Sequence, residues 1–129
     1  MRKDRKVSFS DCGPGVDIYA PGTSIMSVLN TSYSGGGTTD PRSGSLPSYK
    51  IGKISGTSMA SPQVAGWVAC LMETYPHYTQ EQAKAYLISK WAVQGQLYDA
   101  TSTEDPTDTD DLQGSPNVHV KYNFERSID

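Results

Sequence analysis

The 129-residue sequence contains few of the features that mark several common classes of protein. It has only two cysteines, Cys12 and Cys70, which excludes a disulfide-rich scaffold. Cys70 falls within an apolar segment predicted to form a buried helix, so we expect both thiols to be free. The longest stretch without charge, residues 54–72, is interrupted by Ser, Thr, Gln and Pro, which argues against a membrane span. No apolar segment follows the basic residues near the start, so no secretory signal is visible and the sequence assigns no compartment.

Positive charge is also scarce, and it is unevenly placed. The net charge is −3, but residues 1–91 hold 9 basic and 6 acidic groups, whereas residues 92–129 hold 2 basic and 8 acidic groups. The four basic side chains near the start, Arg2, Lys3, Arg5 and Lys6, are typical of a solvated chain end. We therefore expect no nucleic-acid partner.

The chain length favours one domain, with a main part over residues 1–95 and an acidic loop and strand over residues 96–129. Apolar and β-branched runs predict short strands at residues 6–9, 16–20, 24–29, 49–54 and 118–124. Residues 30–48 are rich in Gly, Pro, Ser and Thr and have almost no apolar side chains. This composition predicts a long loop that interrupts the main part.

The segment from residue 59 to residue 75 has one charged side chain, Glu73, and predicts a helix. Because such a helix has no face suited to water, we expect it to be enclosed on most sides. Pro62 is compatible with the first helical turn, where its missing N–H has no acceptor, and Pro76 ends the helix.

A second helix is predicted over residues 80–91. Thr79 and Gln82 have the spacing of a capping box, in which each side chain accepts a hydrogen bond from the other residue's backbone. Ala83, Leu87 and Trp91 recur every four residues and form one apolar face. This helix is therefore amphipathic.

Ser58 stands at the predicted start of the first helix. The first N–H groups of a helix have no acceptor within it and lie at the positive end of its dipole, so an oxyanion beside Ser58 would be stabilised. Gly56 lets another backbone come close, and the side chains of Ala60 and Ser61 are small. A serine that only caps a core helix has the same features, so these residues alone leave both interpretations open.

The run around Ser58 resembles the nucleophile motif of the subtilisin-like (subtilase) serine peptidases. The matching residues are Gly56, Thr57, Ser58, Met59, Ala60, Ser61 and Pro62, followed by Val64, Ala65 and Gly66. Residues 8–10 and 16–22 resemble the two strands that precede the serine in that family. The resemblance covers residues 7–91 and implies the C-terminal third of a catalytic domain. That part is an α/β fold with a partial, mainly parallel sheet, a buried nucleophile helix and an amphipathic helix.

The resemblance further implies that Ser58 is the attacking hydroxyl, that its own N–H is one of two oxyanion donors, and that the substrate is a polypeptide. In this family the aspartate and histidine of the triad, and the asparagine that gives the second oxyanion donor, lie in the first two thirds of the catalytic domain. None of that sequence is present here. Gln63 also replaces the histidine that commonly follows the motif's proline, and this change does not remove the nucleophile.

The chain has two histidines that could replace the missing catalytic histidine as the general base. His77 lies beyond the end of the helix that Ser58 begins, about 27 Å away at the usual helical rise. A general base must lie within about 3 Å of the hydroxyl, which excludes His77. His119 is not excluded by such an argument. With Asp108, Asp110 or Asp111 before it, His119 would give the order Ser, Asp, His of α/β-hydrolases.

The acidic segment at residues 105–111 is also a candidate metal site. Four of its carboxylates, those of Asp105, Asp108, Asp110 and Asp111, are close enough in sequence to bind calcium. The segment lacks the glycine that the EF-hand pattern requires. A solvated acidic loop is the favoured interpretation, and we expect no cofactor.

Three functions compete. The favoured one is a fragment or split subunit of a serine endopeptidase, whose aspartate and histidine come from an upstream segment or a partner chain that also covers the exposed side of the sheet. The second is a catalytically inactive structural or interaction module on a subtilase scaffold. The run from Gln113 to Asn117 faintly resembles phage-encoded subtilase-like proteins, so one form of this module is a virion component. The third is an independent hydrolase that uses His119.

Overall fold

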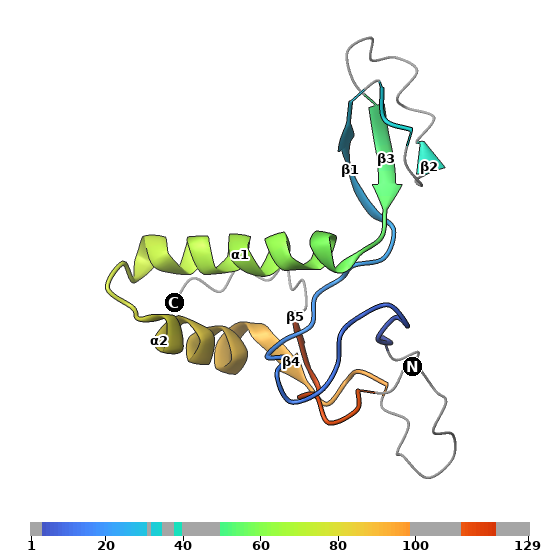
Figure 1. The fold of residues 1–129 in the computed structure, drawn as a ribbon. Coiled ribbons are helices and arrows are strands. Elements are labelled where there is room, and N and C mark those ends of the chain that lie inside the picture. The colour runs from blue at the N-terminus through green and yellow to red at the C-terminus, as the bar shows by residue number, and fades with distance from the viewer. Residues whose placement is uncertain (1–3, 31, 35–37, 40–49, 99–111, 121–129) are drawn as a thin grey trace.

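The computed structural model describes residues 4–30, 32–34, 38–39, 50–98 and 112–120. These residues form five strands, β1 (Ile25–Leu29), β2 (Thr38–Thr39), β3 (Lys50–Ile54), β4 (Ala92–Gln94) and β5 (Val118–Val120), and two helices, α1 (Thr57–Thr74) and α2 (Gln80–Tyr86). A π-helical turn, η2 (Leu87–Trp91), continues α2. In chain order three strands precede the helices and two strands follow them, so the described chain combines helices and strands as an α/β class does. Figure 1 shows α1 and α2 lying side by side.

Strands β1, β3 and β2 form a sheet with β3 in the centre. β1 pairs with β3 so that Ile25 faces Ile54 and Leu29 faces Lys50, which confirms the strands predicted at residues 24–29 and 49–54. β2 lies within the segment predicted to be a loop, most of which is outside the described residues. Figure 1 shows this sheet standing apart from the helices, and Val28 is 63% exposed. The described chain therefore supplies no layer that covers it.

The mainly parallel sheet is not confirmed. All three pairings between named strands of the described chain are antiparallel, and parallel pairing is limited to the isolated bridges Asp4–Leu97 and Tyr19–His119. The strand predicted at residues 6–9 is wrong, because the chain turns there and the Ser10 N–H donates to the Val7 carbonyl at 3.0 Å. Consecutive parallel strands are joined by long crossovers, usually helical, whereas β1, β2 and β3 follow one another with no helix between them.

The predicted C-terminal strand is confirmed over β5, and residues 121–129 lie outside the described residues. β5 joins β4, a strand that was not predicted, with Val93 facing His119. All three residues of β5 are buried. Leu112 and Leu97 are also buried, and the side chain of Asn117, just before β5, bonds to the backbone of Leu97. This small sheet is part of the core of the described chain.

The expectation that the first helix is enclosed on most sides is wrong for the described chain. Leu71 is the only buried residue of α1. Exposed residues recur every three to four positions along the opposite side, which we call the open face of α1: Ser58, Ser61, Pro62, Ala65, Gly66, Ala69 and Cys70. Both cysteines are free, as predicted, although Cys70 is exposed rather than buried. The apolar sequence of α1 suits a helix enclosed on most sides, but in the described chain only the side of α1 that faces α2 is covered.

The α2 side of α1 is held by apolar and aromatic contacts. Leu71, Ala83 and Leu87 are buried there. The rings of Trp67 and Trp91 meet edge to face, with centroids 5.2 Å apart. The predicted apolar face of the second helix is therefore confirmed, and it packs against α1.

A second group of rings closes the end of the two helices. Tyr75 stacks on Tyr78 with centroids 4.7 Å apart, and both rings contact Tyr86. Burial and a hydrogen bond with Tyr75 raise the pKa of Tyr86 above its usual value. These contacts fix the turn that follows α1.

The capping box at the start of α2 is confirmed. The Gln82 N–H donates to Oγ1 of Thr79 at 3.3 Å, and the Thr79 N–H donates to Oε1 of Gln82 at 2.9 Å. A backbone hydrogen bond and the Thr79 hydroxyl lower the pKa of Glu81 in the same turn. Lys84 forms a salt bridge with Asp17, which links α2 to residues 16–20. Of the helices described here, none combines the length and the apolar character needed to cross a membrane.

Candidate functional site

The start of α1 is fixed by a close contact between two glycines. Gly56 is the N-cap residue, and its N–H donates to the carbonyl of Gly22 at 2.8 Å. A Cβ atom on Gly22 would lie 3.0 Å from the carbonyl oxygen of Gly56, which is tighter than ordinary van der Waals contact. A glycine at position 22 therefore lets the preceding chain approach the helix start this closely.

Ser58 is the second residue of α1, and its side chain is exposed. The Met59 N–H donates to the Gly56 carbonyl at 3.0 Å, whereas the N–H of Ser58 donates to no acceptor in the described part of the chain. The first turn of α1 contains no acidic residue that would offset the helix dipole. Ser58 thus combines an exposed hydroxyl with an available N–H at the positive end of a helix.

Gln63 has a structural role in the second turn. Its Nε2 donates to the Pro21 carbonyl at 2.6 Å and to the Met59 carbonyl at 2.9 Å. Together with the contact between Gly22 and Gly56, these bonds hold residues 21–22 against the start of α1. The sequence motif does not reveal this role, because the bonds depend on where Pro21 lies in space.

Two cavities flank the first turns of α1. The first, of about 460 Å³, is lined by residues that include Asp4, Lys6, Thr57 and His119. The second, of about 500 Å³, lies between residues 16–20 and the side of α1 that bears Ser61, Val64 and Ala65. Both are lined by Ser10, Tyr19, Ala20, Thr57 and Ala60, whereas Ser58 lines neither. Residues 16–20 are therefore not packed closely against the helix.

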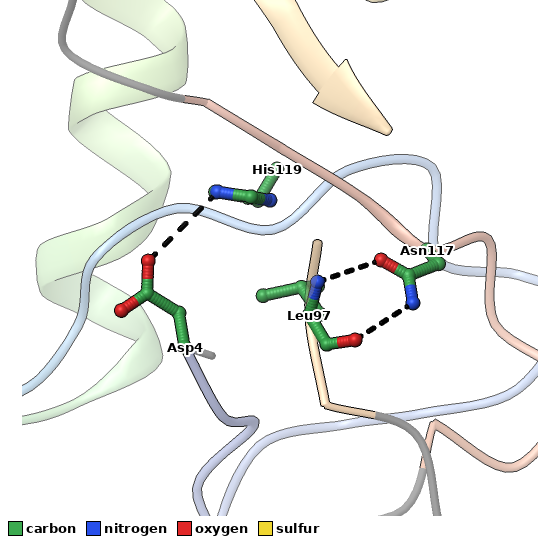
Figure 2. Close-up of polar contacts among 4 residues, drawn as sticks. All are labelled: Asp4, Leu97, Asn117 and His119. Carbon is green, nitrogen blue, oxygen red and sulfur yellow. Dashed lines mark hydrogen bonds and ion pairs between the residues drawn. The ribbon is translucent and has the colours of Figure 1, made fainter. Parts of the chain in front are cut away.

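His119 lies in β5 and is 7% exposed. Its Nε2 is 3.9 Å from Oδ2 of Asp4, as Figure 2 shows. Nearby, the Asn117 amide holds the backbone of Leu97 through hydrogen bonds of 2.9 and 3.0 Å. Asp4 was not singled out from the sequence, because the two chain ends come together only in the fold. The aspartates considered as partners of His119, Asp108, Asp110 and Asp111, lie outside the described residues.

Neither histidine is placed as a base for Ser58. His119 lines the first cavity together with Thr57, but Ser58 makes no hydrogen bond with it or with any other described side chain. His77 is exposed in the turn after α1, at the far end of an 18-residue helix. At the usual helical rise that separates it from Ser58 by about 27 Å.

Within the described ranges, no three His, Cys, Asp or Glu side chains form a group that could hold a metal ion. The four carboxylates considered for calcium, those of Asp105, Asp108, Asp110 and Asp111, lie outside these ranges.

Comparison with known proteins bears directly on these residues. The model of the Subtilase family matches residues 2–117. An extracellular protease of Xanthomonas campestris pv. campestris is 49% identical over 71 residues, which cover 55% of this chain and 10% of that protein. Proteinase R of Parengyodontium album is 43% identical over 96 residues, covering 74% of this chain and 20% of that protein. A subtilisin of Bacillus pumilus is 36% identical over 86 residues, covering 67% and 25% respectively.

This chain therefore spans between 10% and 25% of the length of these relatives. No solved structure gives a significant match.

Proposed function

This chain belongs to the subtilase family, and we propose that it is the nucleophile-bearing part of a subtilisin-like serine endopeptidase, with the aspartate and histidine supplied by another segment or chain. The observation that supports this proposal most is the position of Ser58 within the family's motif. Its hydroxyl is exposed in the first turn of α1, beside its own available N–H. Polypeptides are the proposed substrates.

The proposed reaction follows the chemistry of an activated serine. Oγ of Ser58 attacks the carbonyl carbon of the scissile peptide while the supplied histidine accepts its proton. The carbonyl oxygen becomes an oxyanion that receives a hydrogen bond from the N–H of Ser58. Collapse of this intermediate breaks the C–N bond, the histidine protonates the leaving amine, and an acyl group stays on Ser58. Water then attacks the acyl group and restores the serine.

The motif neighbours of Ser58 have supporting roles in this proposal. Gly56 sets the start of α1 through its bond to Gly22, and Ala60 and Ser61 contribute only small side chains to the first turns of α1. Thr57, Met59 and Pro62 complete the turn that presents the hydroxyl.

The chain alone should be essentially inactive. A serine hydroxyl without a base is a weak nucleophile, and neither His77 nor His119 bonds to Ser58 in the described part of the chain. This requirement separates the proposal from the independent hydrolase considered above.

Labelling with a serine-directed fluorophosphonate tests the proposal. We expect no reaction of the chain alone and stoichiometric reaction at Ser58 when a polypeptide bearing the aspartate and histidine is added. Ser58→Ala should abolish labelling. Ser61→Ala is the matched control, because Ser61 is an exposed serine on the same face of α1, and it should leave labelling intact.

Two results would count against the proposal. Stoichiometric labelling of the chain alone would show that no second polypeptide is required. A folded complex with such a polypeptide that leaves Ser58 unlabelled would favour the inactive structural module.

A further inference from the structure

Five aromatic rings form a continuous series of contacts where α1 packs against α2 and η2, and we call this series the aromatic row. Trp67 in α1 meets Trp91 at the end of η2, with ring centroids 5.2 Å apart. Trp91 meets Tyr86 at 5.6 Å, and Tyr86 meets Tyr75 at 5.6 Å. Tyr75 stacks on Tyr78 at 4.7 Å. The row therefore leads from within α1 to the turn that follows it, and each step joins two rings in contact.

The two ends of the aromatic row differ in chemistry and in access to water. Both tryptophans of the sequence, Trp67 and Trp91, lie at one end and are half-buried. The other end consists of tyrosines, of which Tyr75 is 37% exposed. The side chains of Tyr75 and Tyr86 also share a hydrogen bond. A phenolic proton can therefore pass between these two tyrosines, and one released at Tyr75 can pass to water.

Packing alone does not require the three phenolic hydroxyl groups of the row. Aromatic rings stabilise a helix interface through buried area and edge-to-face contacts, which phenylalanine also provides. Tyrosine differs from phenylalanine because it can lose one electron and its phenolic proton to form a neutral radical. At neutral pH a phenol undergoes this loss more readily than an indole does. An oxidised tryptophan therefore takes an electron from a tyrosine that it contacts.

We propose that the aromatic row restores Trp67 and Trp91 after attack by a small inorganic radical, by moving the oxidising equivalent to the surface at Tyr75 and Tyr78. The inorganic radical takes one electron from an indole and becomes an anion, while the indole N–H proton passes to water. Tyr86 then gives one electron to the indolyl radical and releases its phenolic proton, and the indole nitrogen recovers a proton from water. The transfer is independent of the chemistry of Ser58.

The oxidising equivalent then leaves the protein through the exposed tyrosines. Tyr75 restores Tyr86 with one electron and a proton, which moves along their shared hydrogen bond. A dissolved reductant of the ascorbate type gives a hydrogen atom to the Tyr75 radical and is itself oxidised by one electron. All side chains of the row are then in their original state, and the net reaction is reduction of the inorganic radical by the dissolved reductant.

This transfer protects a contact that holds the two helices together. The edge-to-face pair of Trp67 and Trp91 joins α1 to η2. An indole that stays oxidised reacts further to give polar products, and polar groups are costly in a packed apolar interface. Tyr86 contacts Trp91 on one side and Tyr75 on the other. Tyr86 is therefore the position at which the row can be interrupted.

Pulse radiolysis of the full chain at neutral pH tests the proposal, with azide radical as the oxidant. Azide radical attacks tryptophan faster than tyrosine, and since the chain has two tryptophans, the indolyl radical formed first lies on Trp67 or Trp91. Indolyl and phenoxyl radicals have separate absorption bands. We expect the indolyl band to decay as the phenoxyl band rises, at a rate that does not depend on protein concentration. Absence of this conversion, or a rate proportional to protein concentration, would overturn the proposal.

Tyr86→Phe keeps the ring and removes the hydroxyl. We expect the conversion to slow by about tenfold or more, because the electron must then come from Tyr75 or Tyr78, for which the described structure shows no contact with Trp91. Tyr33→Phe is the matched control, since Tyr33 lies between β1 and β2 and outside the row, and it should convert at the original rate. Near-ultraviolet circular dichroism reports whether the tryptophan pair keeps its packing. Equal rates in two folded variants would overturn the proposal.

A second variant tests the exit at the surface and decides the matter if Tyr86→Phe does not fold. Replacing Tyr75 and Tyr78 together by phenylalanine leaves the contact between Trp91 and Tyr86 in place, so a phenoxyl radical should still form. Because Tyr86 is half-buried, ascorbate should remove this radical several-fold more slowly than it removes the radical of the original protein. Removal at an unchanged rate would show that the oxidising equivalent does not leave through the exposed tyrosines, and would overturn the proposal.

Discussion

The backbones of Gly22 and Gly56 meet at the start of α1, where the Gly56 N–H donates to the Gly22 carbonyl across 2.8 Å. The contact joins two segments that are separated in sequence by β1, β2 and β3. It places Ser58 two residues after an anchored glycine. The position of the candidate nucleophile thus depends on a packing contact that any side chain at position 22 would disturb.

Gly22→Ala is expected to destabilise the protein by about 1–2 kcal/mol, because the new Cβ would lie 3.0 Å from the Gly56 carbonyl oxygen. This cost exceeds the gain of about 0.4–1 kcal/mol that a Gly→Ala change can bring through the unfolded state. Urea unfolding measures the difference. Gly15→Ala is the control, since a Cβ there meets nothing within 4 Å, and it should be neutral or slightly stabilising. Equal effects of the two variants would show that the contact does not constrain the helix start.

Gln63→Leu is expected to cost about 1 kcal/mol, because it removes the donors to the carbonyls of Pro21 and Met59. Gln63→Glu should cost more at neutral pH, since its carboxylate cannot donate and would face both oxygens. Urea unfolding of the two variants at pH 7 checks this order. If Glu were the better tolerated residue, the hydrogen bonds would not be what stabilises this position.

Thr79→Ala is expected to destabilise the protein by about 1 kcal/mol through loss of the cap of α2. The variant should also raise the pKa of Glu81, because the Thr79 hydroxyl is one cause of its lowered value. A lowered carboxyl pKa favours folding above the unfolded pKa, and this contribution is lost as the pH falls through the folded pKa. Thr74→Ala, at the last residue of α1, is the control and should leave the pKa of Glu81 unchanged in an NMR titration.

Local patterns predicted the helices well. The capping box of Thr79 and Gln82 and the four-residue spacing of Ala83, Leu87 and Trp91 are properties of neighbouring residues, and the structure confirms both. Ser58 was likewise identified from a short run, and it lies in the first turn of α1 as expected. Features set by local backbone chemistry were therefore readable from the sequence.

Features set by distant partners were not. The sequence of α1 indicates an enclosed helix, yet Ala65, Ala69 and Cys70 are exposed, because the described residues cover only one side of it. The strand predicted at residues 16–20 is reduced to a single bridge between Tyr19 and His119, which lies near the other end of the described chain. The pairing of Asp4 with His119 joins the two ends of the described chain, and no local pattern encodes it.

His119→Ala is expected to leave the rate of fluorophosphonate labelling unchanged, per folded molecule, in the complex that contains the supplied aspartate and histidine. The reason is geometric: His119 makes no hydrogen bond with Ser58 in the described structure, and its Nε2 faces Asp4 instead. The variant should still be less stable, because His119 is buried against β4. Asp4→Asn is a milder companion, since Asp4 is exposed and a pair at 3.9 Å contributes less than about 1 kcal/mol. If a folded His119→Ala protein lost labelling tenfold or more, His119 would be acting on Ser58, and the base would come from this chain after all.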